Sequence, residues 1–145
     1  MQDNIKVKGN LKIVQFDEHN KIKDVREIPN LVVTVGKGYI AERMTTNTTV
    51  IMSHMAAGSQ NTAPVASETA LGTELGRVAL DSTTANANTV AYVATFPAGV
   101  ATGSLTEAGI FNANANGTML CRTQFNEINK SASDAIVITW NININ

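Results

Sequence analysis

The chain has 145 residues, of which 43% are hydrophobic and 16% are charged, and its formal net charge is −1. This length is typical of a single domain with a sizeable core, so we expect one β-rich domain over residues 1–145. The balanced charge gives no electrostatic reason to expect binding to nucleic acid or to an anionic membrane. Cys121, the single cysteine, excludes a disulfide within the chain.

The start of the sequence lacks a basic segment followed by an apolar core, so we do not expect a secretory signal peptide. No apolar run approaches the roughly 20 residues that a membrane-spanning helix needs. Charge is unevenly distributed along the chain. Residues 1–44 carry eight basic and six acidic side chains, whereas residues 45–145 carry three and six and are rich in Thr, Asn, Ser and Ala. That neutral composition is suited to packing against neighbouring subunits, although it also fits simple compositional drift.

The first 28 residues predict a β-hairpin. Apolar side chains alternate with polar ones along its first strand, at Ile5, Val7, Leu11 and Ile13. Gly9 is a candidate bulge within this strand. Residues 17–20 have turn composition, and residues 21–28 return as the second strand, which Pro29 ends.

The following segments mix strand, helix and loop signals. Residues 31–35 are a short β-prone run, and residues 38–44 are the best helix candidate, with Tyr39, Ile40 and Met44 on one face. Residues 50–57 predict an interior strand because both faces carry apolar side chains. Residues 58–66 predict a loop, and residues 67–71 a single helical turn.

The second half of the chain predicts further strands at 75–80, 89–96, 105–111, 119–125 and 135–145. A polar link, 81–88, joins the first two, and Asn114-Ala115-Asn116-Gly117 predicts a hairpin turn because Asn-Gly tolerates positive φ. Residues 129–133 predict the turn before the last strand. In that strand apolar side chains occupy alternate positions, at Ile136, Ile138, Trp140, Ile142 and Ile144. It therefore predicts one core face and one Asn/Thr face.

The sequence predicts about eight or nine strands and one short helix near 38–44, with turn signals roughly every ten residues. This pattern favours an all-β fold, a single antiparallel β-sandwich or barrel. No helix is long enough for repeated crossovers between parallel strands. The sequence shows no internal repeat and no linker.

No catalytic or metal-binding pattern emerges. Neither His19 nor His54 has a Cys, Asp or Glu at zinc-ligand spacing, and His54 is interpreted as a hydrogen-bonded strand residue. Gly36-Lys37-Gly38 lacks the spacing of a phosphate-binding loop and is interpreted as a strand-to-helix turn. Ser53, Ser59 and Ser67 lack a nucleophile elbow. We therefore predict no catalytic, cofactor-binding or metal-binding residues, no cofactor and no enzymatic activity.

Other polar residues have structural interpretations. Cys121 is predicted to be a buried, unreactive thiol. Glu74 and Glu107 are interpreted as partners of Arg77 and Arg122 in structural or interfacial ion pairs. The three glycosylation sequons are expected chance matches in a chain this rich in Asn and Thr; they begin at Asn47, Asn116 and Asn129.

Several segments, taken in order, resemble a family of small structural proteins of tailed bacteriophages. They are Asn30-Leu31-Val32-Val33 with Gly36-Lys37, Ser53–Ser59, Thr69-Ala70-Leu71-Gly72-Thr73-Glu74-Leu75-Gly76-Arg77, Thr106-Glu107-Ala108-Gly109-Ile110-Phe111, and Thr139-Trp140. The resemblance implies a virion component with a β-fold and no catalysis. Related segments occur in capsid-associated proteins and in tail-fibre or collar proteins.

The physical interpretation favours a capsid decoration (cement) protein, since the chain has neither a repetitive shaft nor a separate tip domain. We then expect the major capsid protein as partner and a homotrimer, because capsid sites of local three-fold symmetry would hold three copies. The alternative is a tail-fibre, collar or baseplate component that binds tail proteins. A receptor- or glycan-binding module ranks last, because most of the seven aromatic residues occupy core-facing positions.

Overall fold

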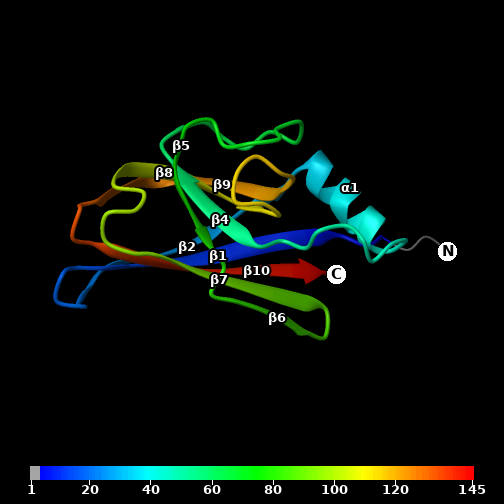
Figure 1. The fold of residues 1–145 in the computed structure, drawn as a ribbon, viewed down its shortest axis with the longest axis horizontal. Helices are drawn as coiled ribbons and strands as arrows, with labels where there is room; N and C mark the ends of the chain where they lie inside the picture. Colours follow the sequence, from blue (N-terminus) through cyan, green and yellow to red (C-terminus); the bar gives the residue numbers. More distant parts are fainter. Residues whose placement is uncertain (1–3) are drawn as a thin grey trace.

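Two five-stranded antiparallel sheets pack against each other in the computed structural model, which describes residues 4–145 (Figure 1). Sheet A has the order β2 (Ile22–Pro29), β1 (Val7–Phe16), β10 (Ala135–Ile144), β7 (Thr89–Phe96) and β6 (Ser82–Asn86). Sheet B has the order β3 (Leu31–Val32), β9 (Met119–Lys130), β8 (Gly103–Phe111), β4 (His54–Gly58) and β5 (Glu74–Ala79). One helix, α1 (Thr34–Arg43), follows β3. The prediction of an all-β antiparallel fold with one short helix is confirmed, and it is a sandwich-like arrangement rather than a closed barrel.

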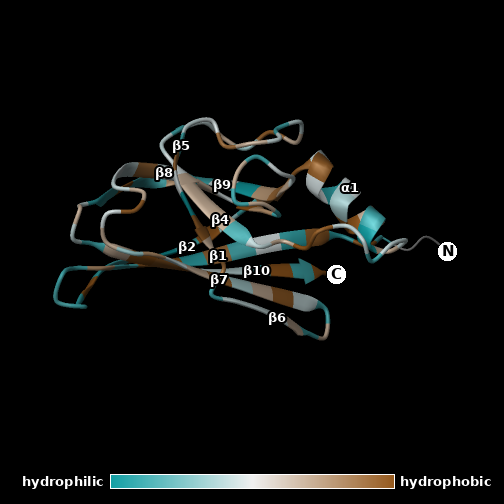
Figure 2. Ribbon diagram, in the orientation of Figure 1, coloured by the Kyte–Doolittle hydropathy of each residue, from teal (hydrophilic) through white to brown (hydrophobic). Residues whose placement is uncertain are grey.

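Strand β10 forms the centre of sheet A, as its alternation predicts. Ile136, Ile138, Trp140 and Ile142 are each at most 4% exposed. Hydrophobic and hydrophilic bands alternate along this strand in Figure 2. β10 pairs along its length with β1, where Leu11 lies opposite Trp140, and with β7 on the other side. Its inward side chains join residues of both sheets in one hydrophobic core.

The β8–β9 hairpin of sheet B has the predicted Asn-Gly turn. Asn116 and Gly117 both adopt positive φ, 55° and 76°. Asn has a short polar side chain that tolerates this conformation, and Gly has no Cβ to oppose it. β9 then continues to Lys130, five residues beyond the predicted end at 125.

Three local predictions were wrong for physical reasons: the start of the helix, the turn at Gly36-Lys37-Gly38 and the bulge at Gly9. The helix begins at Thr34 rather than near 38, so Gly36-Lys37-Gly38 lies inside α1 and is not a turn. Gly36 allows α1 to approach β9 closely, because a Cβ there would overlap the backbone carbonyl of Leu120. Gly9 is not a bulge. It pairs in register with Ile142 and leaves space for the Asn30 side chain, and the register shift of this strand lies at Gln15/Phe16 instead.

Other differences concern the predicted strands and loops. The link 81–88 contains strand β6, whose five residues are all exposed and therefore show no alternation of apolar side chains. The predicted strand 50–57 begins only at His54, since Val50 and Ile51 are exposed. Residues 67–71 form no helix, and a turn closes there with the Glu68 N–H donating to the Val65 carbonyl.

The N-terminal hairpin is confirmed for the residues that the structure describes, as β1 and β2. Its predicted first residues, 1–3, lie outside the described range. Within residues 4–145, no helix combines the length and the apolar character that crossing a membrane requires.

Candidate interaction surface

An apolar groove of about 400 Å³ lies between α1 and one end of sheet A. Tyr39 and Ile40 come to it from α1, Val90 and Tyr92 from β7, and Ile142 from β10. These side chains meet because α1 packs against β9 above the ends of β7 and β10. The groove lies at the end of the sandwich where β10 ends, and α1 lies at the same end in Figure 1.

The rim of this groove exposes large apolar side chains. Met44 is 82% exposed, Ile51 is 55% exposed and Ile144 is 41% exposed, and all three line the groove. Single exposed apolar residues are common on protein surfaces, but a cluster around a hollow is typical of an interaction site. The groove is therefore the strongest candidate for a contact with another molecule.

Two tyrosines give the groove polar atoms without charge. The Met52 N–H donates a hydrogen bond to the Tyr39 hydroxyl over 3.3 Å. Burial raises the pKa of Tyr92, so its phenol stays neutral throughout the physiological range. The groove interior therefore suits neutral, mainly apolar partner groups.

Strand β6 forms one wall of the groove and is also a free edge of sheet A. Thr83 and Ala85 line the groove, and all five residues of β6 are exposed. β6 pairs with β7 on one side and has no strand neighbour on the other among the described residues. A free edge presents backbone N–H and C=O groups that another strand can bind.

Arg43 supplies the positive charge at the groove. One guanidinium nitrogen, Nη1, donates to the Thr49 carbonyl over 2.9 Å. Within residues 4–145 no carboxylate lies within ion-pair distance of this side chain. The residues that line the groove include no Asp or Glu, so Arg43 is the charged side chain among them.

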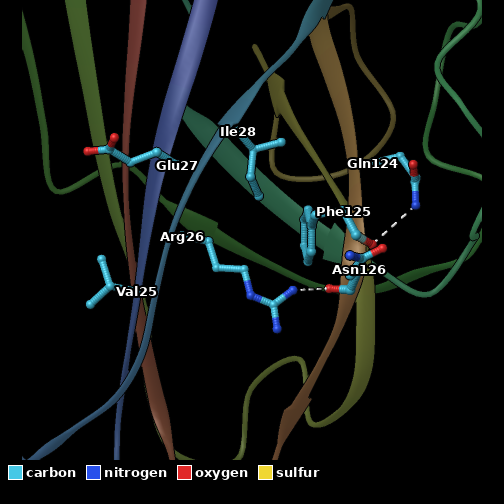
Figure 3. A pocket seen from close by; sticks show the side chains of 7 residues that line it. All are labelled: Val25, Arg26, Glu27, Ile28, Gln124, Phe125 and Asn126. Atoms are coloured by element: carbon cyan, nitrogen blue, oxygen red, sulfur yellow. Dashed lines mark hydrogen bonds between the residues drawn. The ribbon is translucent and has the colours of Figure 1, made fainter.

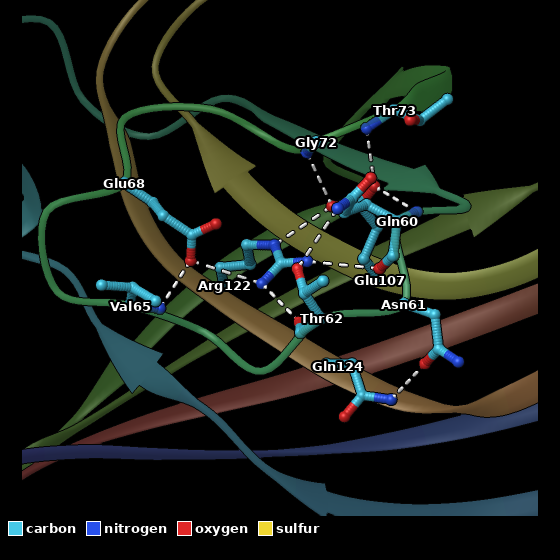
Figure 4. A network of polar contacts seen from close by, with 10 residues as sticks. All are labelled: Gln60, Asn61, Thr62, Val65, Glu68, Gly72, Thr73, Glu107, Arg122 and Gln124. Atoms are coloured by element: carbon cyan, nitrogen blue, oxygen red, sulfur yellow. Dashed lines mark hydrogen bonds and ion pairs between the residues drawn. The ribbon is translucent and has the colours of Figure 1, made fainter.

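A polar cluster is buried between sheet B and the connection from β4 to β5 (Figure 4). Glu107 has no exposed surface, and its carboxylate accepts four hydrogen bonds. The donors are the backbone N–H groups of Gln60 (2.8 Å), Gly72 (2.9 Å) and Thr73 (2.9 Å), and Nε of Arg122 (3.1 Å). A buried carboxylate is stable when it is paired and fully hydrogen-bonded, and here both conditions hold.

Arg122 uses its remaining nitrogens on the same loop. Nη1 donates to the Thr62 carbonyl (3.0 Å) and to Glu68 Oε1 (3.3 Å), and Nη2 donates to the Gln60 carbonyl (3.3 Å). Glu68 Oε1 also accepts a hydrogen bond from the Val65 N–H. The pair therefore fixes residues 59–73, the long connection between β4 and β5, to the sheet. This is a structural role, and the predicted Glu107–Arg122 ion pair is confirmed.

The predicted Glu74–Arg77 pair is also confirmed, with 2.6 Å between Arg77 Nη2 and Glu74 Oε1. Arg77 lies 3.8 Å over the Phe111 ring and donates from Nη1 to the carbonyls of Ala113 and Asn116. Its guanidinium is thereby occupied in holding the β8–β9 turn against β5. A hollow of about 540 Å³ beside it is lined by these same groups, which leaves no unpaired charge for a ligand.

The open side of the sandwich, between β2 and β9, holds another hollow of about 500 Å³ (Figure 3). Arg26 spans it, donating to the carbonyls of Asn126 and Glu127. Phe125 points into the space between the strands in Figure 3 and is 6% exposed. The side chains here connect the two sheets, and we assign the hollow a structural role.

Asp134 connects the hairpin β1–β2 to the turn before β10. Its Oδ2 accepts hydrogen bonds from Lys23 Nζ (2.9 Å), Gln15 Nε2 (3.0 Å) and the Ser131 N–H (2.9 Å). The hydrogen bond from Lys23 is the main cause that lowers the pKa of Asp134, to about 2. The carboxylate is therefore charged at neutral pH despite being only 2% exposed.

The other residues that the sequence analysis considered lie in different parts of the structure. His54 is a hydrogen-bonded strand residue, as predicted, with 2.8 Å between Nδ1 and Ser53 Oγ. His19 lies in the exposed β1–β2 turn, far along the chain from it. Cys121 is fully buried, as predicted, and burial raises the pKa of its thiol. Among the described residues, no three His, Cys, Asp or Glu side chains gather in a way that would hold a metal ion.

The groove itself was not predicted. Its wall β6 gives no sequence signal, and its lining comes from distant segments that come together only in the fold. The exposed Met44 at the end of a short helix was the one local signal that could have indicated it. No family model matches this chain, and neither a curated protein nor a solved structure matches it significantly.

Proposed function

We propose that this protein is a non-enzymatic structural component of a tailed-bacteriophage virion, a decoration protein that binds the outer surface of the capsid and stabilises the shell. The observation that carries the proposal is the apolar groove beside an uncharged free edge strand, a surface suited to protein contacts. The resemblance of the segments around Glu107 and Arg77 to phage structural proteins supplies the biological context.

The arrangement of those segments supports a structural rather than a chemical role. The pieces Thr69–Arg77 and Thr106–Phe111 meet in the structure, where Glu107 accepts hydrogen bonds from Gly72 and Thr73. Glu107 holds the loop 59–73, and Arg77 pairs with Glu74 and holds the β8–β9 turn. They thus maintain a rigid framework, which a protein that clamps a shell requires.

We further propose a homotrimer, because three copies would match the local three-fold sites of a capsid lattice. The Thr-, Asn- and Ala-rich surface offers neutral area for subunit contacts, and an obligate interface needs about 2,000 Å² or more. Light scattering on the purified protein is expected to give three times the mass of one chain. A monomer at working concentration would contradict the trimer.

The test of the proposed function is binding to purified phage particles. The protein is expected to sediment with expanded empty capsids at many copies per shell and to raise the temperature at which the shells break. Tails purified separately are the matched control, on which no binding is expected. Binding to tails in a few copies, without binding to capsids, would overturn the proposal in favour of a tail-fibre, collar or baseplate component.

A further inference from the structure

We propose that the free edge of β6 and the adjoining groove receive an extended segment of the capsid protein as an added β-strand. The segment would carry apolar side chains at alternate positions and a carboxylate that pairs with Arg43. This inference rests on the proposed function and names the part of the molecule that makes the contact.

The four edge strands of the two sheets differ in how they are protected. β2 carries Lys23, Asp24, Arg26 and Glu27 and ends at Pro29. β3 has two residues, and β5 carries Glu74 and Arg77 and pairs with β4 through a register shift. Charges, short length, proline and irregularity are the features that prevent unwanted strand pairing. β6 has none of them: its sequence is Ser-Thr-Thr-Ala-Asn.

The backbone of β6 is oriented to accept a strand. Asn86 lies opposite Thr89 across a two-residue turn, and Thr83 and Ala85 lie opposite Tyr92 and Val90. Because hydrogen-bonded and non-hydrogen-bonded pairs alternate from the turn, this register directs the N–H and C=O groups of Thr83 and Ala85 away from β7. An incoming strand would satisfy those groups.

The side chains of the same two residues line the groove. Since side chains on neighbouring strands at paired positions lie on the same face, alternate side chains of an added strand would enter the groove beside Thr83 and Ala85. There they would meet the exposed side chains of Met44, Ile51 and Ile144. Main-chain pairing would provide affinity and the groove would provide selectivity for apolar side chains.

The charge of the groove specifies a further feature of the segment. Arg43 lies on the groove, engages one carbonyl, and has no carboxylate partner among the described residues. An incoming Asp or Glu would form a charge-assisted pair with it, whereas a Lys or Arg would be repelled. The partner segment is therefore apolar and acidic.

The test is quantitative binding of variants to expanded empty capsids. Ala85→Pro removes an outward N–H without touching the β6–β7 ladder, and Ala85→Lys adds an edge charge while keeping all backbone groups. Both are expected to weaken binding by about tenfold or more. Thr84→Ala, whose side chain lies on the opposite face, is the matched control and is expected to bind like the natural protein.

Arg43 is tested in the same assay. Arg43→Glu is expected to weaken binding by about tenfold, and Arg43→Lys to retain most of it. Amide hydrogen exchange provides an independent measurement, since strand addition should slow exchange at Thr83 and Ala85 on capsid binding. If Ala85→Pro fails to fold, Ala85→Lys and the exchange data decide.

The outcomes distinguish the inference from the function. One outcome is an Ala85→Lys variant that folds and binds capsids as the natural protein does, with no change in amide exchange at Thr83 on binding. That result would overturn strand addition and leave the decoration role intact. Failure of the natural protein to bind capsids would overturn the proposed function itself. If the Ala85 variants instead convert an oligomer into monomers, the occupant of the groove is a second copy of this chain, and the inference is wrong.

Discussion

Glu107 shows how one side chain can determine the path of a long loop. The connection between β4 and β5 contains no helix or strand, yet three of its backbone N–H groups converge on this carboxylate. Arg122 neutralises the charge from the neighbouring strand β9. The loop is therefore ordered by electrostatics in a water-excluded site, where hydrogen bonds to an ion are strong.

Replacing Glu107 by Gln is expected to destabilise the protein by about 3–5 kcal/mol. The buried charge of Arg122 loses its opposite charge, and the amide group of Gln places N–H donors where the backbone N–H groups of the loop need an acceptor. Chemical denaturation measures the loss, and amide exchange at Gly72 and Thr73 should accelerate. The matched control is Glu74→Gln, at a carboxylate that is 35% exposed, which should cost less than about 1 kcal/mol. Equal effects of the two substitutions would contradict this account.

Asp134 makes stability depend on pH in a defined window. Its pKa is lowered from 3.8 to about 2 in the folded protein. A lowered pKa stabilises the fold above about pH 4, and that contribution is lost as pH falls from 4 towards 2. Asp134→Asn is thus expected to cost about 1–2 kcal/mol at pH 7 and progressively less below pH 4. Urea unfolding at several pH values measures the difference, with Asp24→Asn as control. A constant difference from pH 7 to pH 2 would contradict the assignment.

At the scale of elements, α1 depends on two glycines that have opposite surroundings. Gly36 faces the Leu120 carbonyl of β9, whereas a Cβ on Gly38 would meet no atom within 4 Å. Helical propensity favours Ala over Gly by about 0.5–1 kcal/mol at both positions. Close packing reverses that preference at Gly36, because the whole helix would have to move.

Gly38→Ala is accordingly expected to stabilise the protein by about 0.5–1 kcal/mol, and Gly36→Ala to destabilise it by about 1–3 kcal/mol. Thermal unfolding of the two variants side by side measures both effects. Stabilisation by Gly36→Ala would show that α1 can move away from β9 without loss. Since Tyr39 and Ile40 lie on the same helix, the Gly36 variant should also alter the groove.

Strands with one buried face could be predicted from sequence. Exposed strands, and segments whose conformation depends on contacts with distant parts of the chain, could not. β10 and β7 alternate clearly and were found with nearly correct boundaries. β6 was missed because no face of it is buried, so its strand conformation follows from pairing with β7. The start of α1 was misplaced because Leu31–Val35 has strong β propensity, yet β9 offers pairing only as far as Val32.

At the scale of the molecule, the two sheets share one core whose centre is β10. Ile138 is 2% exposed and lies between Ile13 of β1 and Ala94 of β7. The Glu74–Arg77 and Glu107–Arg122 pairs could be anticipated from sequence, because few other charges compete in the second half of the chain, whereas the Lys23–Asp134 and Glu68–Arg122 pairs were not predicted. The groove could not be anticipated, since it exists only where the ends of distant segments meet.

Ile138→Asp is expected to cost at least about 3 kcal/mol, because it places an unpaired charge in this core. Asn143→Ser, on the opposite face of the same strand, removes the hydrogen bond from Thr89 and should cost about 1 kcal/mol or less. Melting temperatures compare the two. A soluble Ile138→Asp protein with an unchanged melting temperature would show that this position is not in the core.

The pairing of β1 with β10 also has a consequence for synthesis. Val7 lies opposite Ile144, so the central ladder of sheet A joins residues separated by nearly the whole described chain. During synthesis on the ribosome, the apolar face of the β1–β2 hairpin stays exposed until residue 144 has emerged and β10 can pair with β1. Long-range pairings of this kind fold slowly and leave strand edges open to wrong partners. We therefore expect yield in a cell to depend on the rate of translation and on chaperones more strongly than the stability of the finished fold would suggest.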